Sequence, residues 1–252
     1  MPREGTGFGD SGGSSISGLS GPLVVALLAG CENNVRRILL SARDAGADLA
    51  RISVELIEPA LGQIGEMWVR REISIAEEHL ATSLVTRTIG LVIDPAKPRR
   101  AGAPRIVLAC LSGEFHELGL RIISEVAREA GWEPEELGAN VPRAALTAFL
   151  GQRPPQAVGL SISLPGHIPE CSETIRLCRK AAPGAKILVG GRIFRADPDL
   201  GSLLDADFVV PDVVSLRDWL RTSRRALSRR PASPMPAKLP LPGGLSPRPR
   251  GR

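Results

Sequence analysis

The sequence is poor in aromatic residues and in paired cysteines. Phe and Trp make up 3% of its 252 residues and Tyr is missing, so a tryptophan that stands in a motif is informative. None of the four cysteines (Cys31, Cys110, Cys171 and Cys178) belongs to a Cys-x-x-Cys pair. We therefore expect reduced thiols and a cytoplasmic protein.

Long apolar runs and targeting signals are also missing. The run Leu23–Ala29 is far too short to span a bilayer. The Gly/Ser-rich N-terminus lacks the basic-then-apolar pattern of a secretory signal. These absences predict a protein without a membrane segment.

Acidic residues are missing from the end of the chain. None follows Asp218, whereas nine Arg and Lys residues do, so the net charge of +5 belongs to the tail. Such a tail can contact nucleic acid weakly and non-specifically, or it is a solvated extension. Its Pro, Arg, Ser and Gly content favours the second reading, a basic disordered tail over residues 223–252.

The first third of the chain has helical patterns. Residues 1–21 are expected to be disordered, and residues 22–93 predict a four-helix bundle in which Pro59 kinks the third helix. Ser74-Ile75-Ala76-Glu77 is a capping box that starts the fourth helix. Residues 94–104 contain three prolines and predict a linker.

Strand and helix patterns alternate over residues 105–222, which predicts an α/β domain with a flavodoxin-like (Rossmann-like), five-stranded parallel sheet in the order 2-1-3-4-5. The strands are expected over Arg105–Cys110, Trp132–Leu137, Ala157–Ser163, Lys186–Val189 and Asp207–Val210. The helices are expected over Leu118–Ala130, Arg143–Leu150, Pro169–Ala181, Pro198–Leu203 and Val213–Leu227.

Glu114 and His116 stand in the turn that follows the first strand, where open parallel sheets bind ligands. His116 can ligate a metal through one ring nitrogen while Glu114 accepts a hydrogen bond from the other. No second His or Cys lies nearby in the sequence, so the metal would arrive already coordinated, as in a macrocycle. Alternatively, His116 is a solvated loop histidine.

Two further features end strands that adjoin the first strand in this sheet order. Ser161 and Ser163 end the third strand, and Gly190-Gly191 follow the fourth. A serine offers a short hydroxyl, and a glycine pair lets backbone approach a ligand closely. All three features therefore converge on one crevice.

The motif Glu114–Gly119 (Glu-x-His-x-x-Gly), then Ser161–Ser163 after 41 residues and Gly190-Gly191 after another 26, resembles the signature of cobalamin-binding domains. The family pattern has Asp and Leu where this chain has Glu114 and Ser163. The resemblance implies that the benzimidazole base leaves cobalt and that His116 replaces it as the lower ligand. It also implies that the nucleotide tail passes Ser161 and the glycine pair.

The bundle region resembles the cap of cobalamin-dependent photoreceptors of the CarH type, because nine residues separate Trp68 from Glu78-His79. The resemblance implies that Trp68 covers the upper corrin face and that Glu78 and His79 contact the adenosyl group. Family members have a His after the Trp; Val69 stands here, which leaves His79 as the upper ligand after photolysis. They also have an N-terminal helix-turn-helix domain, which we expect to be absent.

These features predict a cobalamin-binding sensor, most simply of light, that holds adenosyl- or methylcobalamin and signals through a partner transcription factor. The sequence does not determine whether the chain forms homo-oligomers. The alternative is a corrinoid-carrying subunit of a methyltransferase, which does not require the Trp…Glu-His motif. A mutase subunit is disfavoured. His167, the third histidine, lies on the crevice side in the loop after the third strand, where it contacts either the cofactor's tail or nothing, and we favour the second.

Overall fold

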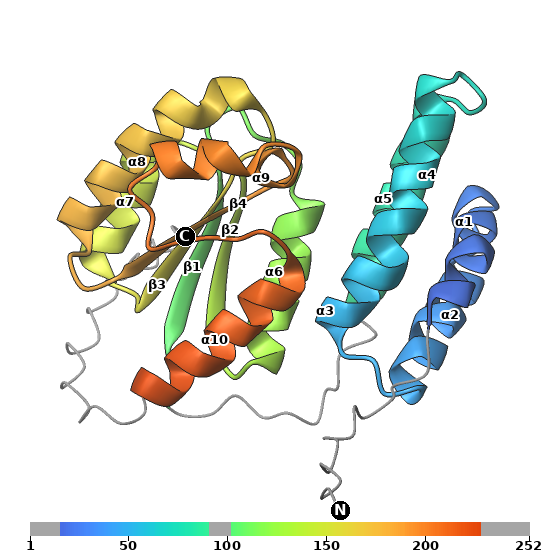
Figure 1. Cartoon of the computed structure of the whole chain (residues 1–252), viewed down its shortest axis with the longest axis horizontal. Helices are drawn as coiled ribbons and strands as arrows, with labels where there is room; N and C mark the ends of the chain where they lie inside the picture. Colours follow the sequence, from blue (N-terminus) through green and yellow to red (C-terminus); the bar gives the residue numbers. More distant parts are fainter. Residues whose placement is uncertain (1–15, 91–101, 228–252) are drawn as a thin grey trace, which may run out of the picture.

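The computed structural model describes residues 16–90 and 102–227, which form a helical bundle beside an α/β domain (Figure 1). The bundle confirms the predicted four-helix cap, its third helix being formed by three consecutive segments. Its elements are η1 (Ser17–Leu19), α1 (Ser20–Leu28), α2 (Glu32–Asp44), α3 (Leu49–Ile52), the π-helical η2 (Ser53–Ile57), α4 (Glu58–Val69) and α5 (Ile75–Ile89).

The predicted kink at Pro59 is a π-helical turn. Pro59 lies in the first turn of α4, and η2 precedes it without a break in the chain of helices. A proline lacks the N–H for the usual helical bond, and its ring would clash with the carbonyl four residues earlier. The wider π turn makes room for that ring. Ser74 and Glu77 form the predicted capping box at the start of α5.

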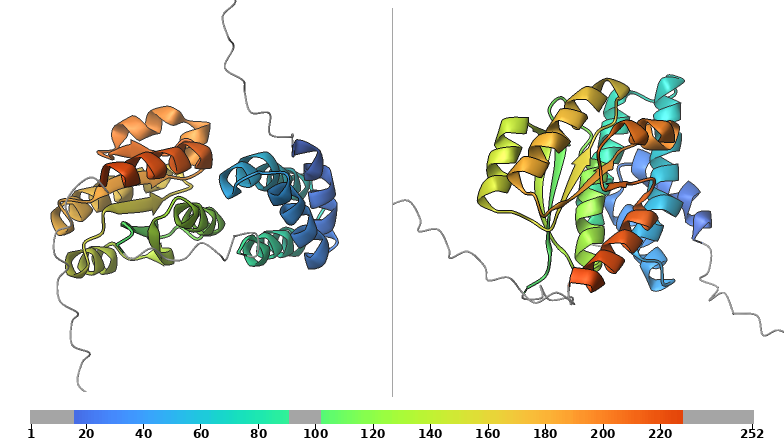
Figure 2. Two further views of the ribbon diagram at one scale, coloured as in Figure 1. Left: turned by 90° about the horizontal axis from the view of Figure 1, so that it is seen from below. Right: turned by 60° about the vertical axis from the view of Figure 1, so that its left-hand side comes forward.

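The sheet has the predicted parallel order β2-β1-β3-β4-β5. The strands are β1 (Arg105–Leu111), β2 (Glu133–Val141), β3 (Ala157–Ser161), β4 (Lys186–Gly190) and β5 (Phe208–Val209). The helices are α6 (Leu118–Glu129), α7 (Arg143–Gln152), η3 (Pro165–His167), α8 (Ile168–Ala181), α9 (Ile193–Ala196), η4 (Pro198–Leu203) and α10 (Val213–Leu227). Figure 2 shows α6 and α10 on the side of the sheet that faces the bundle.

Some predicted boundaries were wrong. β2 continues beyond Leu137, because positive φ angles at Gly138 (82°) and Asn140 (50°) let the strand bulge and stay paired. The single turn α9 was missed because four residues show no apolar period.

The predicted disordered ends are partly helical. Residues 17–21 belong to η1 and α1, and Ile16, directly before them, is buried in the bundle core. Residues 223–227 continue α10. The remainder of both segments, and most of the predicted linker, lies outside the described residues.

The bundle and the sheet domain share one apolar core, to which α6 and α10 of the sheet domain contribute. Ile122 and Val126 of α6 belong to the apolar cluster of the bundle, and Val213 and Val214 of α10 pack against it. This shared core fixes the bundle beside the carboxyl edge of the sheet.

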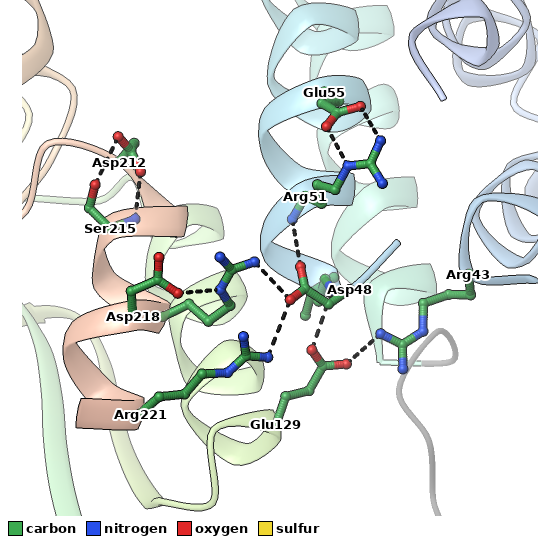
Figure 3. Close-up of polar contacts among 11 residues, drawn as sticks. Arg43, Asp48, Arg51, Glu55, Glu129, Asp212, Ser215, Asp218 and Arg221 are labelled. Carbon is green, nitrogen blue, oxygen red and sulfur yellow. Dashed lines mark hydrogen bonds and ion pairs between the residues drawn. The ribbon is translucent and has the colours of Figure 1, made fainter. Parts of the chain in front are cut away.

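Polar contacts reinforce this shared core (Figure 3). Glu129, at the end of α6, accepts hydrogen bonds from Arg43 of α2 (2.7 Å) and from the backbone N–H of Leu49 (3.3 Å). Asp48, which caps α3, accepts from Arg217 (2.8 Å) and Arg221 (3.3 Å) of α10. The N-terminus of α3 is therefore tied to two helices of the sheet domain, α6 and α10.

Candidate cofactor site between the bundle and the sheet

A cavity of about 1490 Å³ lies between the bundle and the carboxyl ends of the strands. Pockets for drug-sized ligands measure roughly 300–1,000 Å³, so this one suits a larger molecule. Seven of the ten predicted site residues line it: Trp68, Glu78, His79, His116, Gly119, Gly190 and Gly191. The other three, Glu114, Ser161 and Ser163, are buried below its wall.

The carboxylate–histidine pair has the predicted geometry. Nδ1 of His116 lies 2.6 Å from Oε1 of Glu114, which also accepts the backbone N–H of His116 at 2.9 Å. The His116 side chain is 61% exposed, whereas that of Glu114 is 1% exposed. Because a carboxylate can only accept, Nδ1 carries the proton and Nε2 keeps its lone pair for a metal.

Glu114 stays ionised and held from two sides. Its other oxygen, Oε2, accepts the backbone N–H of Ser163 at 2.5 Å. Burial by itself would raise the pKa of Glu114, but hydrogen bonds from His116 and Ser163 hold that pKa below its usual value. The longer glutamate, in place of the family's aspartate, thus reaches the imidazole.

Cys110 lies beneath the His116 loop, at the end of β1. Its Sγ contacts the carbonyl oxygen of His116 at 3.8 Å. Burial, and then the charge of Glu114, raises the pKa of Cys110 to about 12. The group is therefore a neutral thiol that supports the loop, and it offers no thiolate for a metal.

The glycine pair lets two strand ends close against each other. Gly191 has φ 132°, and a Cβ there would lie 1.7 Å from the carbonyl oxygen of Ile162. A Cβ on Gly190 would meet Val210 at 3.4 Å. Ser161 is buried in β3, where it pairs with Cys110 and Gly190. Gly191 is thus demanded by the fold itself, in addition to any ligand.

The predicted cap residues form the opposite wall of the cavity. Trp68, near the end of α4, is 45% exposed, so it is not a core aromatic of the bundle. Oε2 of Glu78 lies 2.6 Å from Nδ1 of His79, and Oε1 of Glu78 accepts the hydroxyl of Thr82 at 3.1 Å. The His79 side chain is 72% exposed.

Sequence reasoning missed the rest of this wall. Thr82 and Thr86 of α5 line the cavity on the same helix face as Glu78, as their four-residue spacing could have indicated. Gly62 and Gly65 of α4 also line it, and no described atom lies within 4 Å of the place a Cβ would take on either. The upper wall is therefore polar on one helix and hollowed on the other.

His167, expected to touch nothing functional, lies behind the carboxylate–histidine pair. Its Nδ1 is 3.9 Å from Oε2 of Glu114 and is buried, without a hydrogen-bond partner among the residues described. Glu114 lies in the turn after β1 and His167 after β3, and these strands are neighbours in the sheet. The fold thus brings a second histidine to the same carboxylate.

Within residues 16–90 and 102–227, no three His, Cys, Asp or Glu side chains are grouped closely enough to hold a metal ion. Across these same ranges, no helix has the length and apolarity that crossing a membrane would require.

A helical bundle over the carboxyl edge of a 2-1-3-4-5 sheet, with a carboxylate-bound histidine in the cavity between them, defines a corrinoid-binding module. Residues 104–212 match the model of the B12 binding domain, and residues 21–93 match that of a second B12 binding domain. The chain therefore contains B12 binding domains in both of its parts, and the residues of its cavity fit cobalamin as the cofactor.

Two curated relatives come from Myxococcus xanthus. The HTH-type transcriptional repressor CarA is 36% identical over 126 residues, which cover 50% of this chain and 43% of CarA. The HTH-type transcriptional repressor CarH is 32% identical over 145 residues, or 56% of this chain and 47% of CarH. The chain therefore spans less than half the length of these relatives.

The fold also matches a solved structure, the monomethylamine corrinoid protein of Methanosarcina barkeri. The TM-score is 0.64 at 13% sequence identity, over 80% of this chain and 96% of that one. This likeness shows that the two chains share the arrangement of bundle and sheet.

Proposed function

We propose that the chain is a light sensor that binds adenosylcobalamin base-off, with His116 as the lower axial ligand, and signals through a partner transcription factor. The observation that supports this most is the Glu114–His116 pair, which lies on the opposite side of one large cavity from Trp68. The repressor names of the relatives CarA and CarH support a regulatory role.

Each residue has a separate task in this proposal. His116 offers the Nε2 lone pair to cobalt, and Glu114 holds the proton on Nδ1 and so sets the ring orientation. Trp68 covers the upper face and excludes water from it. Bound alkylcobalamin supplies a cobalt–carbon bond that visible light breaks. Once that bond is broken, His79 would be the histidine of the cap available to hold cobalt.

The chemistry of the upper wall favours an adenosyl group over a methyl group. Glu78, Thr82 and Thr86 present a carboxylate and two hydroxyls, which match the donors and acceptors of a nucleoside. The hollow at Gly62 and Gly65 provides space for it. A methyl group could form no hydrogen bond with any of these side chains. Loss of the adenosyl group would remove its contacts with this wall and bias the bundle toward a second position.

The alternative function is a corrinoid-carrying subunit of a methyltransferase. Its support is the shared arrangement of bundle and sheet, which both functions require. A methyltransferase subunit would carry a methyl group and would have no use for the polar face of α5. The upper wall therefore favours the sensor.

The test compares the full chain with His116→Ala, each reconstituted in the dark with adenosylcobalamin or methylcobalamin. The unmutated chain is expected to bind the adenosyl form base-off and to change its visible spectrum under green light. His116→Ala should lose the His-on spectrum and retain cofactor poorly, whereas Arg176→Ala, on the exposed face of α8, should behave as the unmutated chain does.

Each outcome bears on one part of the proposal. A spectrum that green light leaves unchanged would contradict the sensor. A preserved His-on spectrum in His116→Ala would contradict the assignment of the lower ligand. Chromatography in the dark and after illumination would show whether assembly of the chain follows the signal.

A further inference from the structure

His167 is held against Glu114 without bonding to it. The ring lies in η3, after β3, with 20% of its side chain exposed, and does not line the cavity. Nδ1 faces Oε2 of Glu114 at 3.9 Å, about 1 Å longer than a hydrogen bond. A buried ring nitrogen without a partner has lost its hydration with nothing in return. A small rotation toward the carboxylate would remove that cost.

The surroundings keep the ring within reach. A Cβ on Gly113 would lie 3.4 Å from Nε2 of His167, and Gly113 has φ 81°. Gly113 itself is fixed, because its N–H donates to the side-chain oxygen of Asn140 at 2.8 Å. The imidazole is therefore packed against the loop that holds both Glu114 and His116.

A further hydrogen-bond donor would help to hold the carboxylate of Glu114 in one orientation. A glutamate has one more rotatable bond than the aspartate of the family pattern, so its carboxylate needs more contacts to stay in one orientation. Oε1 is held twice by His116, whereas Oε2 is held by Ser163. Nδ1 of His167 faces Oε2, where it would add a further contact to those of Ser163.

We propose that His167 is a positioning residue for the lower axial ligand. Its Nδ1–H closes onto Oε2 of Glu114 and fixes the carboxylate that orients His116. His167 touches neither the cofactor nor the metal and acts through Glu114. The inference deepens the proposed function and rests on it, because it assumes that His116 binds cobalt.

The first test needs no cofactor. Proton–nitrogen correlation spectra of the full ¹⁵N-labelled chain report which ring nitrogen of each histidine carries the proton. His167→Asn removes one set of ring signals and so identifies those of His167. We expect the Nδ1–H form for His167. The Nε2–H form would overturn the proposal, since Nδ1 would then have no proton to donate.

The second test reads the bond to cobalt by electron paramagnetic resonance of bound cob(II)alamin. In ¹⁵N-labelled protein a histidine ligand splits the cobalt lines into doublets, whereas the unlabelled benzimidazole base gives triplets. We expect the doublet-to-triplet ratio to fall about tenfold in His167→Ala, as is usual when a partner of a metal ligand is lost. His167→Asn, whose amide N–H lies near the place of Nδ1, should restore the ratio.

Leu164→Ala is the matched control, because it alters an exposed side chain of the same loop. An unchanged ratio in His167→Ala would overturn the proposal. So would an equal loss in His167→Asn or in Leu164→Ala, which would reveal a merely structural role. Triplets alone in the unmutated chain would instead refute His116 as the ligand, and the positioning role would fall with it.

Discussion

Arg217 of α10 donates to Asp48 at the start of α3 over 2.8 Å, although 169 residues separate them. The same Asp48 side chain accepts the backbone N–H of Arg51 and so caps α3. One carboxylate therefore starts a bundle helix and ties it to the sheet domain. Another ion pair between the two parts lies at the cavity. It joins Glu58 of α4 to Arg195 of α9, whose side chain is about half exposed.

Replacing Asp48 should separate its two roles. Asn caps a helix as well as Asp does, so Asp48→Asn removes only the ion pairs and should lower the free energy of unfolding by about 1 kcal/mol. Asp48→Ala also removes the cap and should cost about 1 kcal/mol more. Urea unfolding measures both. Asp218→Asn, which alters an exposed partner of Arg217, should change little, and an equal loss there would contradict this assignment.

Acid should weaken the same contact. Burial opposes ionisation of Asp48, but the N–H of Arg51 and the charge of Arg217 hold its pKa below the ordinary value of 3.8. The folded pKa thus lies below the unfolded one. The ionised group therefore contributes stability above pH 3.8, and this is lost as pH falls through the folded pKa. Stability measured against pH should fall less steeply in Asp48→Asn, and parallel curves would argue against the role.

Alanine should be tolerated differently at the two glycines of the pair. Gly191→Ala would place a Cβ 1.7 Å from the carbonyl oxygen of Ile162 at φ 132°, and we expect a loss of about 3 kcal/mol or more. Gly190→Ala meets Val210 only at 3.4 Å and should cost less. Thermal unfolding of the cofactor-free chain decides this. Equal melting temperatures would show that the strand end relaxes.

Trp68 should affect the upper ligand but not the fold. Trp68 is 45% exposed and lines the cavity, so Trp68→Ala removes only part of its packing and should lower the unfolding free energy by about 1–2 kcal/mol while the chain stays folded. The preference for adenosylcobalamin over methylcobalamin, measured by competitive binding in the dark, should fall. Val69→Ala, on the next and more exposed residue, is the control. An unaltered preference would show that Trp68 does not contact the upper face of the cofactor.

The Glu58–Arg195 pair should govern exchange of the cofactor rather than stability. Exposed ion pairs contribute about 0–1 kcal/mol, so Arg195→Glu should leave unfolding almost unchanged. Like charges at the cavity rim should nevertheless speed release of cobalamin, measured by dilution and stopped-flow absorbance. The double change Glu58→Arg with Arg195→Glu should restore slow release. If release stays fast, the ion pair does not control cofactor exchange.

The fold was largely predictable from sequence, because its signals are local. Apolar runs at a period of two or 3.6 residues mark strands and helices, and alternating units leave few sheet orders open. The Glu114–His116 pair was predictable too, since the residues are two positions apart in a turn whose place in the sheet follows from that order. The exposure of Trp68 was not, because helical spacing also suits a core aromatic.

Local patterns in the sequence therefore predict the bundle, the sheet order and the histidine at the edge of the sheet. The contacts that hold these parts together depend instead on how the elements pack. Asp48 meets Arg217, Gly191 passes close to Ile162, and His167 approaches Glu114. Each pair joins separate elements whose distance depends on how the layers pack, and no local period in the sequence encodes that distance.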